Sequence, residues 1–393
     1  MSQGGRDQAS LATKDDHRDE RLARAALCRL GEPGDPRLTG LVAELGAPAV
    51  YDHLRSEVDH AGLASDVAQR LAALDPVADL ERADRQGIRF LVPGDDEWPD
   101  RLSALERPEP VNGRGGCPLG LWVRGPLRLA EAVRRAVAVV GSRSATSYGA
   151  DAAGEIGATV ARAGHTVISG AAFGIDQAAH RGALAVRGPT IAVLACGVDR
   201  AYPSAHRQLL DYIADTGLVV SELAPQCAPT KLRFLSRNRL IAGLGRGTVV
   251  VEAAVRSGAL NTATWTQRLN LPVMGVPGPV TSAPSAGVHQ LIRSRDALLV
   301  TSGAEVLEAV APVGDHLLVE PRGAERPHDR LSLLDQQVLD AVPVSLPVTP
   351  VSIARTAGLA ATSVHESLLR LVEAGLVEHS RERYRLAHRT SPP

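Results

Sequence analysis

The stretch AVAVVGSRSATSYGADAAGEIGATVARAGHTVISG, residues 136–170, contains the pattern that decides the fold. Two apolar runs, AVAVV at 136–140 and HTVISG at 165–170, flank a segment that is long enough for a helix. Strands that are apolar at consecutive positions are typical of sheets covered on both faces, and parallel strands need a crossover that is usually helical. The stretch therefore predicts one strand–helix–strand unit of a parallel α/β sheet.

The same alternation of apolar runs and helix-length segments extends to both sides of this stretch. A short strand is expected within 87–92, before Pro93 and Gly94 interrupt the pattern. Further strands are expected within 119–125, 190–197, 218–223, 248–254, 271–278 and 297–302. We therefore predict an α/β fold with a mostly parallel sheet. In such folds ligands bind at the carboxyl ends of the strands, where loops lead into helices.

The pattern changes on either side of this central sheet. Before it, Leu, Ala and Val recur at helical spacing and are interrupted by Gly and Pro, which indicates a small bundle of short helices, SAM-like or helix-hairpin-helix-like. After it, three helices and a hairpin are expected, which is the element order of a winged helix. The predicted segments are a disordered tail at 1–18, a small helical domain at 19–84, a core domain at 85–312, a linker at 313–328, a winged-helix domain at 329–388 and a disordered tail at 389–393.

The composition excludes several classes of protein. The 393 residues carry a formal net charge of −1, so any binding site for an anion is a local feature of the surface. The start of the chain lacks the apolar core of a signal peptide and no later apolar run is long enough to span a bilayer, so we expect a cytoplasmic protein without a membrane partner. The four cysteines form no C-x-x-C pair, so neither a disulfide framework nor a metal site is expected.

A first candidate anion site follows the strand at 136–140. Gly141 allows backbone N–H groups to approach an anion, Ser142 adds a hydroxyl, and Arg143 can bind phosphate oxygens in a fork. The glycines that a dinucleotide-binding loop needs at fixed intervals do not follow. We therefore predict an anion contact here, but no dinucleotide and no other cofactor.

A second loop, SGAAFGID at 169–176, follows the next strand and leads into a helix. Asp176 and His180 are four residues apart and share one face of that helix, so they match a general acid–base couple. They match equally a structural arrangement in which Asp176 caps the helix and His180 bonds locally. Since no third orienting group or activated serine accompanies them, we favour the structural interpretation and predict no catalytic residue.

The third candidate is the stretch 231–246, which contains five cations and no carboxylate. The cations are Lys231, Arg233, Arg237, Arg239 and Arg246. Phe234 lies among them and has two interpretations: an aromatic on which a nucleic-acid base stacks beside backbone-binding arginines, or an apolar residue of the core. The sequence alone leaves both open.

Several motifs occur in an order that resembles the core of the DNA-processing protein DprA family, also called Smf. The resemblance covers residues 98–308, and its motifs are specific. They are GSR at 141–143, SGAAFGIDQAAH at 169–180, ACGVDRAYP at 195–203, SELAP at 221–225, FLSRNRLIAGL at 234–244, VVVEAAVRSGALNTA at 249–263 and VPGPV at 276–280.

This resemblance implies an extended Rossmann-like core domain that binds single-stranded DNA in a basic pocket. It also implies a homodimer that protects incoming DNA and helps to load the RecA recombinase during natural transformation, without enzymatic activity. The residues that it assigns to single-stranded DNA are Gly141, Ser142, Arg143, Gly170, Phe173, Gly174, Lys231, Phe234, Arg237, Asn238 and Arg239.

The sequence departs from the family pattern at a few positions. Phe173 stands where many relatives have a polar or charged residue, and the proline–glycine pair that often follows Ser221–Glu222 is missing. His289 and Arg295 replace an asparagine and a glycine that are common in relatives. We therefore expect the rim of the pocket to differ from theirs.

Two other functions remain as alternatives. Nucleotide phosphoribohydrolases of a similar fold carry a PGGxGTxxE loop, whereas here Glu252 comes before the glycine of the corresponding loop. A regulator would read duplex DNA through the third helix of a winged helix, at 362–376, but there Glu366 and Glu373 accompany Arg370. Both features disfavour the alternatives.

Overall fold

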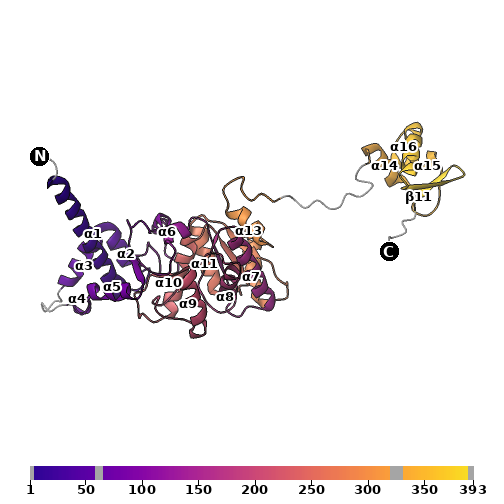
Figure 1. Cartoon of the computed structure of the whole chain (residues 1–393). Coiled ribbons are helices and arrows are strands. Elements are labelled where there is room, and N and C mark those ends of the chain that lie inside the picture. The colour runs from indigo at the N-terminus through magenta and orange to yellow at the C-terminus, as the bar shows by residue number, and fades with distance from the viewer. Residues whose placement is uncertain (1–3, 58–64, 319–330, 388–393) are drawn as a thin grey trace. The chain divides into compact units, whose positions relative to one another are not determined.

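The structure, a computed structural model, describes residues 4–57, 65–318 and 331–387. The chain divides into two compact units, Met1–Leu318 and Val319–Pro393 (Figure 1). The larger unit contains the sheet and every candidate site residue named above. The predicted tail at 389–393 and most of the predicted linker lie outside the described residues.

One sheet forms the centre of the larger unit, and among the described residues it has nine strands in the order β1-β2-β6-β5-β4-β3-β7-β8-β9. The pairings β1–β2 and β2–β6 are antiparallel and all the others are parallel, which confirms the predicted mostly parallel sheet. Each predicted apolar run contains one strand. The strands are β1 (Ile88–Leu91), β2 (Leu121–Arg124), β3 (Ala136–Gly141), β4 (Thr166–Ser169), β5 (Thr190–Val193), β6 (Leu218–Ser221), β7 (Thr248–Val251), β8 (Val273–Val276) and β9 (Leu298–Leu299).

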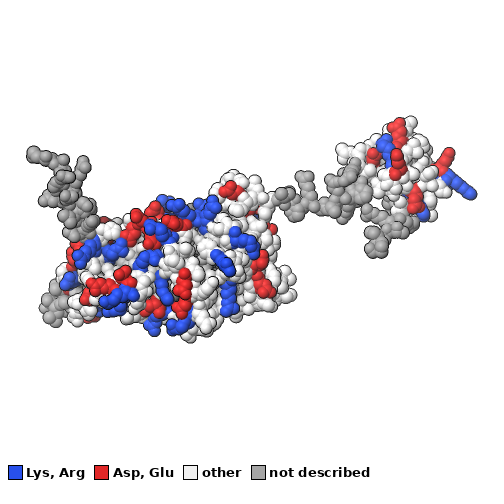
Figure 2. Space-filling model, viewed as in Figure 1, with Lys and Arg blue, Asp and Glu red and all other residues white. Residues whose placement is uncertain are grey.

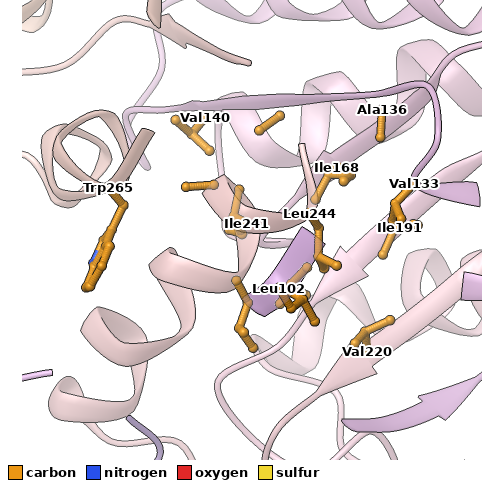
Figure 3. Close-up of a cluster of buried hydrophobic side chains, with 14 of the residues drawn as sticks. Leu102, Val133, Ala136, Val140, Ile168, Ile191, Val220, Ile241, Leu244 and Trp265 are labelled. Carbon is orange, nitrogen blue, oxygen red and sulfur yellow. The ribbon is translucent and has the colours of Figure 1, made fainter. Parts of the chain in front are cut away.

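Helices cover both faces of this sheet because successive side chains of each strand point to opposite faces. Along β3, Ala136, Ala138 and Val140 pack in one cluster, with residues of α10 and α11, while Val137 and Val139 pack in another, with residues of α7 and α8. Figure 3 shows the first cluster. The helices of this region are α6 (Leu129–Ala132), α7 (Ser147–Arg162), α8 (Ile175–Ala185), α9 (Arg207–Thr216), α10 (Lys231–Leu244), α11 (Gly258–Arg268), α12 (Ala286–Arg293) and α13 (Gly303–Val310), with 3-10 helices η1 (Asp100–Glu106), η2 (Ser204–His206) and η3 (Ala283–Ser285).

Five helices precede the sheet and pack against its β1 side. They are α1 (Gly4–Leu30), α2 (Pro36–Leu45), α3 (Ala47–Ser56), α4 (Asp66–Ala72) and α5 (Pro76–Arg85). Leu27 and Val50 belong to the same buried cluster as Phe90 and Trp122 of the first two strands. This shared core joins the small helices to the sheet within one unit.

Helix α1 differs from the prediction of a disordered tail at 1–18, because the helix begins at Gly4. Its C-terminal half is anchored in the core through Leu27, which is completely buried. Extending an existing helix costs far less than nucleating one, and no proline interrupts residues 4–30. The helix therefore continues back through the polar segment.

The smaller unit contains α14 (Leu333–Ala341), α15 (Pro350–Ala357) and α16 (Ala361–Glu373), followed by the antiparallel strands β10 (Val377–Ser380) and β11 (Arg383–Leu386). Helix α15 ends at Gly358, whose φ of 67° supplies the left-handed cap. Val338, Ile353, Leu368 and Tyr384 form part of its core. Three helices and a hairpin thus occur in the order predicted.

Within the described residues, no helix combines the length and apolar character that crossing a membrane requires.

Candidate functional site

A cavity of about 730 Å³ opens at the carboxyl edge of the central sheet. Gly141, Ser142 and Arg143 follow β3 directly, and the segment from Arg256 to Ala259 follows β7, the strand next to β3. The first two turns of α10 form a further wall. Two loops and a helix that are far apart in the sequence thus meet where the sheet topology predicts a ligand site.

The lining of this cavity is positively charged. Arg143, Lys231, Arg237 and Arg256 contribute four cations, and Asp176 is the one carboxylate among the lining residues. Figure 2 shows acidic and basic side chains interspersed over the visible face of the larger unit. The excess of positive charge is therefore a local property of the cavity, as the near-zero net charge of the chain requires.

Phe234 lies on the wall of the cavity close to two guanidinium groups. The guanidinium carbon of Arg143 is 4.7 Å from the centroid of the Phe234 ring, and that of Arg237 is 6.0 Å away. The Tyr202 ring lies next to it, with the two centroids 5.5 Å apart and the planes inclined by 51°. Phe234 is half-buried and lines the cavity. These distances permit cation–π attraction, which orients the arginines around the ring.

Arg237 is a fixed cation rather than a mobile one. Its side chain is buried, and Nη1 donates a hydrogen bond to the Val193 carbonyl oxygen over 3.0 Å. Its Nε is buried without a hydrogen-bond partner among the described residues. Burial lowers the pKa of Arg237, and the negative charge of Asp176 opposes this shift. A cation held in this way loses little side-chain entropy when it binds an anion.

Gly170 makes room for this arginine. A Cβ atom at Gly170 would lie 1.4 Å from Nη1 of Arg237, so a larger residue and the observed guanidinium exclude each other. Gly174, in the same loop as Gly170, makes room for the loop that follows β3. Its φ is 77°, and a Cβ atom there would lie 2.3 Å from the Ser142 carbonyl oxygen. Both glycines therefore shape the cavity through the backbone.

The geometry of Asp176 and His180 favours a structural role. Asp176 accepts hydrogen bonds from the backbone N–H groups of Gly170 (3.2 Å) and Ala172 (3.3 Å), and burial raises its pKa. Nδ1 of His180 lies 2.7 Å from Oγ1 of Thr190, which itself donates to a backbone carbonyl. Burial lowers the pKa of His180 to about 3, so the ring is neutral at physiological pH. The pair holds the loop and the helix in place.

Glu252, at the end of β7, anchors the loop that carries Arg143. Its carboxylate accepts hydrogen bonds from the backbone N–H (2.9 Å) and the hydroxyl of Thr146, and its backbone oxygen accepts one from the Ser142 N–H (2.6 Å). The side chain is buried and does not line the cavity. A glutamate engaged in this way does not match the catalytic glutamate of the phosphoribohydrolase alternative.

Two of the predicted contact residues lie elsewhere. Arg239 is completely buried, and its two terminal nitrogens bind the Glu222 carboxylate over 2.7 and 2.8 Å. Phe173 is 46% exposed and packs edge-on against His206, with the centroids 4.6 Å apart. Neither lines the cavity. The structure therefore gives Arg239 the role of a buried ion-pair partner instead of the predicted DNA contact.

The other residues predicted from the sequence lie at the cavity or support it. Lys231 is exposed at its rim, and Asn238 donates hydrogen bonds to Gly258 and Asn261 (both 3.2 Å), which ties α10 to the start of α11. Arg256 also lines the cavity but was not among the contact residues predicted from the sequence. Its position shortly after the buried run at 248–254 could have indicated it, because loops at strand ends form such sites.

Comparisons with known proteins show which proteins this chain is similar to. Residues 89–311 match the model of the family described as DNA recombination-mediator protein A. A DprA protein of Mycobacterium tuberculosis is 42% identical over 371 residues, which cover 93% of this chain and 94% of that protein. Protein Smf of Escherichia coli is 36% identical over 302 residues, with coverage of 74% and 76%. The crystal structure of DprA from Streptococcus pneumoniae aligns with a TM-score of 0.55 and 32% identity, over 73% of this chain and 96% of that one.

Proposed function

The chain belongs to the DNA recombination-mediator protein A family, and on that premise we propose that it binds single-stranded DNA in the cavity at the carboxyl edge of its sheet. The observation that carries the proposal is the position of Phe234 in the cavity wall next to Arg143 and Arg237. Sites for unpaired strands combine a positively charged groove for the phosphates with aromatic rings on which bases stack.

The same arrangement selects against duplex DNA. In a duplex each base already stacks on its neighbours, so its face is not free to lie on Phe234. In a single strand one base can stack on the ring while the flanking phosphates reach Arg143, Lys231 and Arg256 at the rim. Preference for unpaired DNA thus follows from stacking, whereas the salt dependence of binding follows from the cations.

The cellular role that we propose is the one that the family resemblance implies. The protein protects incoming single-stranded DNA in the cytoplasm, acts as a homodimer, and helps to load the RecA recombinase during natural transformation. It does so by binding alone, without a catalytic residue and without a cofactor. The engagement of Asp176, His180 and Glu252 in structural hydrogen bonds supports this non-enzymatic function.

Regulation of duplex DNA through the smaller unit is the less favoured function. On α16, Arg370 binds Asp335 over 2.7 Å, so its charge is already neutralised. In the hairpin, Arg385 binds Glu378 over 2.8 Å. A surface that reads a DNA groove needs cations free for phosphates, and two arginines of this unit are occupied.

The test is a fluorescence anisotropy titration of labelled oligothymidylate with the full chain. We expect Phe234→Ala to weaken binding by about 1 to 3 kcal/mol, because one stacked base is lost. Tyr212→Ala is the matched control, since Tyr212 is an aromatic residue of α9 that is 51% exposed and does not line the cavity.

Two results would count against the proposal. One is equal affinity of the Phe234 and Tyr212 variants for the single strand. The other is more effective displacement of the labelled strand by unlabelled duplex than by unlabelled single strand. Far-ultraviolet circular dichroism of each variant confirms that a loss of affinity does not reflect unfolding.

A further inference from the structure

A second cavity, of about 860 Å³, lies at the opposite edge of the sheet, where the parallel strands begin. Arg135 comes directly before β3, His165 directly before β4, and Arg246 two residues before β7. Two backbone hydrogen bonds fix these positions: Thr166 N–H donates to the Arg135 oxygen (2.6 Å), and Arg246 N–H donates to the Ala136 oxygen (2.7 Å). The sheet itself thus places Arg135 and Arg246 side by side.

The lining of this cavity contains more cations than carboxylates. Four arginines, Arg101, Arg134, Arg135 and Arg246, stand against Asp100 and Asp315. Burial lowers the pKa of His165, so at neutral pH that ring adds no charge. The arginines alone therefore make this edge of the sheet attractive to anions.

Three of these arginines are free to bind a ligand. Arg134, Arg135 and Arg246 are exposed, and within the described ranges none of their side chains has an ion-pair or hydrogen-bond partner. Some other arginines near the sheet are engaged, for example Arg124 by Asp211 and Arg89 by Glu97. At this cavity, by contrast, three unpaired guanidinium groups lie together.

The fourth arginine and the apolar lining form a rigid floor. Nη1 of Arg101 donates to the carbonyl oxygens of Val133 and Leu244, each over 3.2 Å. Burial lowers the pKa of Arg101, and the nearby positive charge of Arg246 lowers it further. Trp98 and Leu271 line the same cavity and offer an apolar surface to a sugar or base.

The cavity continues into a neighbouring one of about 460 Å³. Arg134 and Arg135 line both, so the two cavities adjoin at these cations. Thr166 and Pro189, at the beginnings of β4 and β5, line the second cavity, together with Arg128 and Glu131. We refer to the two adjoining cavities, lined by Arg101, Arg134, Arg135 and Arg246, as the amino-edge groove. Two adjoining cavities that share cations fit an extended ligand with repeated negative charges better than a compact one.

We propose that the amino-edge groove binds the phosphodiester backbone of a nucleic-acid strand, as a second contact at the edge of the sheet opposite to the Phe234 cavity. This goes beyond the proposed function, which depends on the carboxyl edge alone. A strand long enough to leave the first cavity gains additional phosphate contacts at the groove, whereas a short strand that fills the first cavity does not reach it. Affinity then increases with strand length through electrostatics, independently of base sequence.

The test compares two triple variants of the full chain. In the first, Arg134, Arg135 and Arg246 are each replaced by glutamine; because these side chains have no partners, the fold should not suffer. The matched control replaces Arg55, Arg85 and Arg293 by glutamine, which are also exposed, have no side-chain partner within the described ranges and line neither cavity. Both variants change the net charge by the same amount.

Labelled oligothymidylates of about 6 and about 40 nucleotides serve as probes, since single binding sites for unpaired strands cover about 4 to 16 nucleotides. For the long strand, the slope of log affinity against log salt should become shallower by about 2 in the groove variant, from about 0.7 for each of three phosphates. The slope for the short strand should not change, and the control variant should match the wild type with both strands.

Three outcomes would overturn the proposal. The groove variant and the control could bind the long strand with equal slopes, or the groove variant could lose affinity for both strands to the same extent. Alternatively, thymidine monophosphate or inorganic phosphate could bind the wild type saturably and the groove variant not at all, with the long strand unaffected, which would show a small-anion site. Phe234→Ala, measured with the short strand, tests the proposed function separately.

Discussion

Helix α10 uses arginine in opposite ways on its two sides. On the cavity side, Arg237 donates a hydrogen bond to the Val193 carbonyl oxygen, and its guanidinium group lies near the Phe234 ring. It lines a space that is open to an anion. On the other side, Arg239 is completely buried against Glu222. In the first turn of the helix, Arg233 binds Glu32, between α1 and α2, over 2.7 Å. A cluster of cations in a sequence therefore does not by itself define a ligand site. Carboxylates on distant elements decide which cations remain available.

The largest effect is expected on the buried side of this comparison. Arg239→Met leaves the Glu222 carboxylate buried without its partner, which typically costs about 3 to 5 kcal/mol. We expect a loss of that size in the free energy of unfolding of the larger unit, measured by denaturant titration of tryptophan fluorescence. All three tryptophans, Trp98, Trp122 and Trp265, lie in that unit.

Arg233→Met is the matched control for this prediction. Its partner Glu32 has a side chain that is 39% exposed, so removing this pair should cost at most about 1 kcal/mol. At low denaturant concentration, where Arg239→Met is still folded, its affinity for single-stranded DNA should equal that of the wild type. Equal stability of the two variants would show that burial of the Glu222 pair has no energetic consequence, and reduced affinity of folded Arg239→Met would return this arginine to the binding site.

The second prediction acts on the cavity side. Gly170→Ala places a methyl group where the Arg237 guanidinium lies, so the arginine must move. Overpacking of this kind costs about 1 to 3 kcal/mol of stability, and we expect weaker binding of oligothymidylate because the cation beside Phe234 is displaced. Gly154→Ala is the control, since its nearest neighbour would be the Ala178 oxygen at 3.8 Å. A Gly170→Ala protein that retains full affinity would contradict a role for Arg237 in binding.

The sequence predicted the sheet well because its signals are local. Most strands of the sheet are runs of buried apolar residues, as in TVVV of β7, although β9 is exposed. The Gly141 turn follows from the residues themselves. The position of the cavity was also predictable, since parallel strands present their carboxyl ends at one edge. Arg143, Phe234 and Arg237 meet there for that reason.

The orientation of Arg239 was not predictable from the same stretch. Its partner Glu222 follows β6, and the partner of Arg233 is 201 residues away in the sequence. Helix α10 is buried on several sides, so its apolar spacing does not indicate which face meets the ligand. The contact between the N-terminal helices and the sheet decides which face of α10 is covered. No pattern within residues 231–246 indicates that contact.

The smallest effect is expected for an ion pair whose arginine is more exposed than the arginine of either pair on α10. In the smaller unit Asp335 binds Arg370, whose side chain is 50% exposed, and also accepts hydrogen bonds from Ser367 and Ser332. Donation by Arg370 lowers the pKa of Asp335 from 3.8 to about 2. Because the pKa of the folded state is the lower one, the carboxylate stabilises the unit fully above about pH 4, and this stabilisation is lost as the pH falls through about 2.

Tyr384 reports on this unit alone, as the single tyrosine after residue 318. Its proton resonances, followed by NMR during acid titration of the full chain at fixed denaturant, should shift to the unfolded form between pH 4 and pH 2. In Asp335→Asn the unit should be less stable at neutral pH. It should also lose this pH dependence, because the carboxylate at position 335 that is protonated in this pH range has been removed. If the variant keeps the same acid transition, other carboxylates govern it and the exposed pair contributes nothing measurable, which would extend the contrast with Glu222 to its limit.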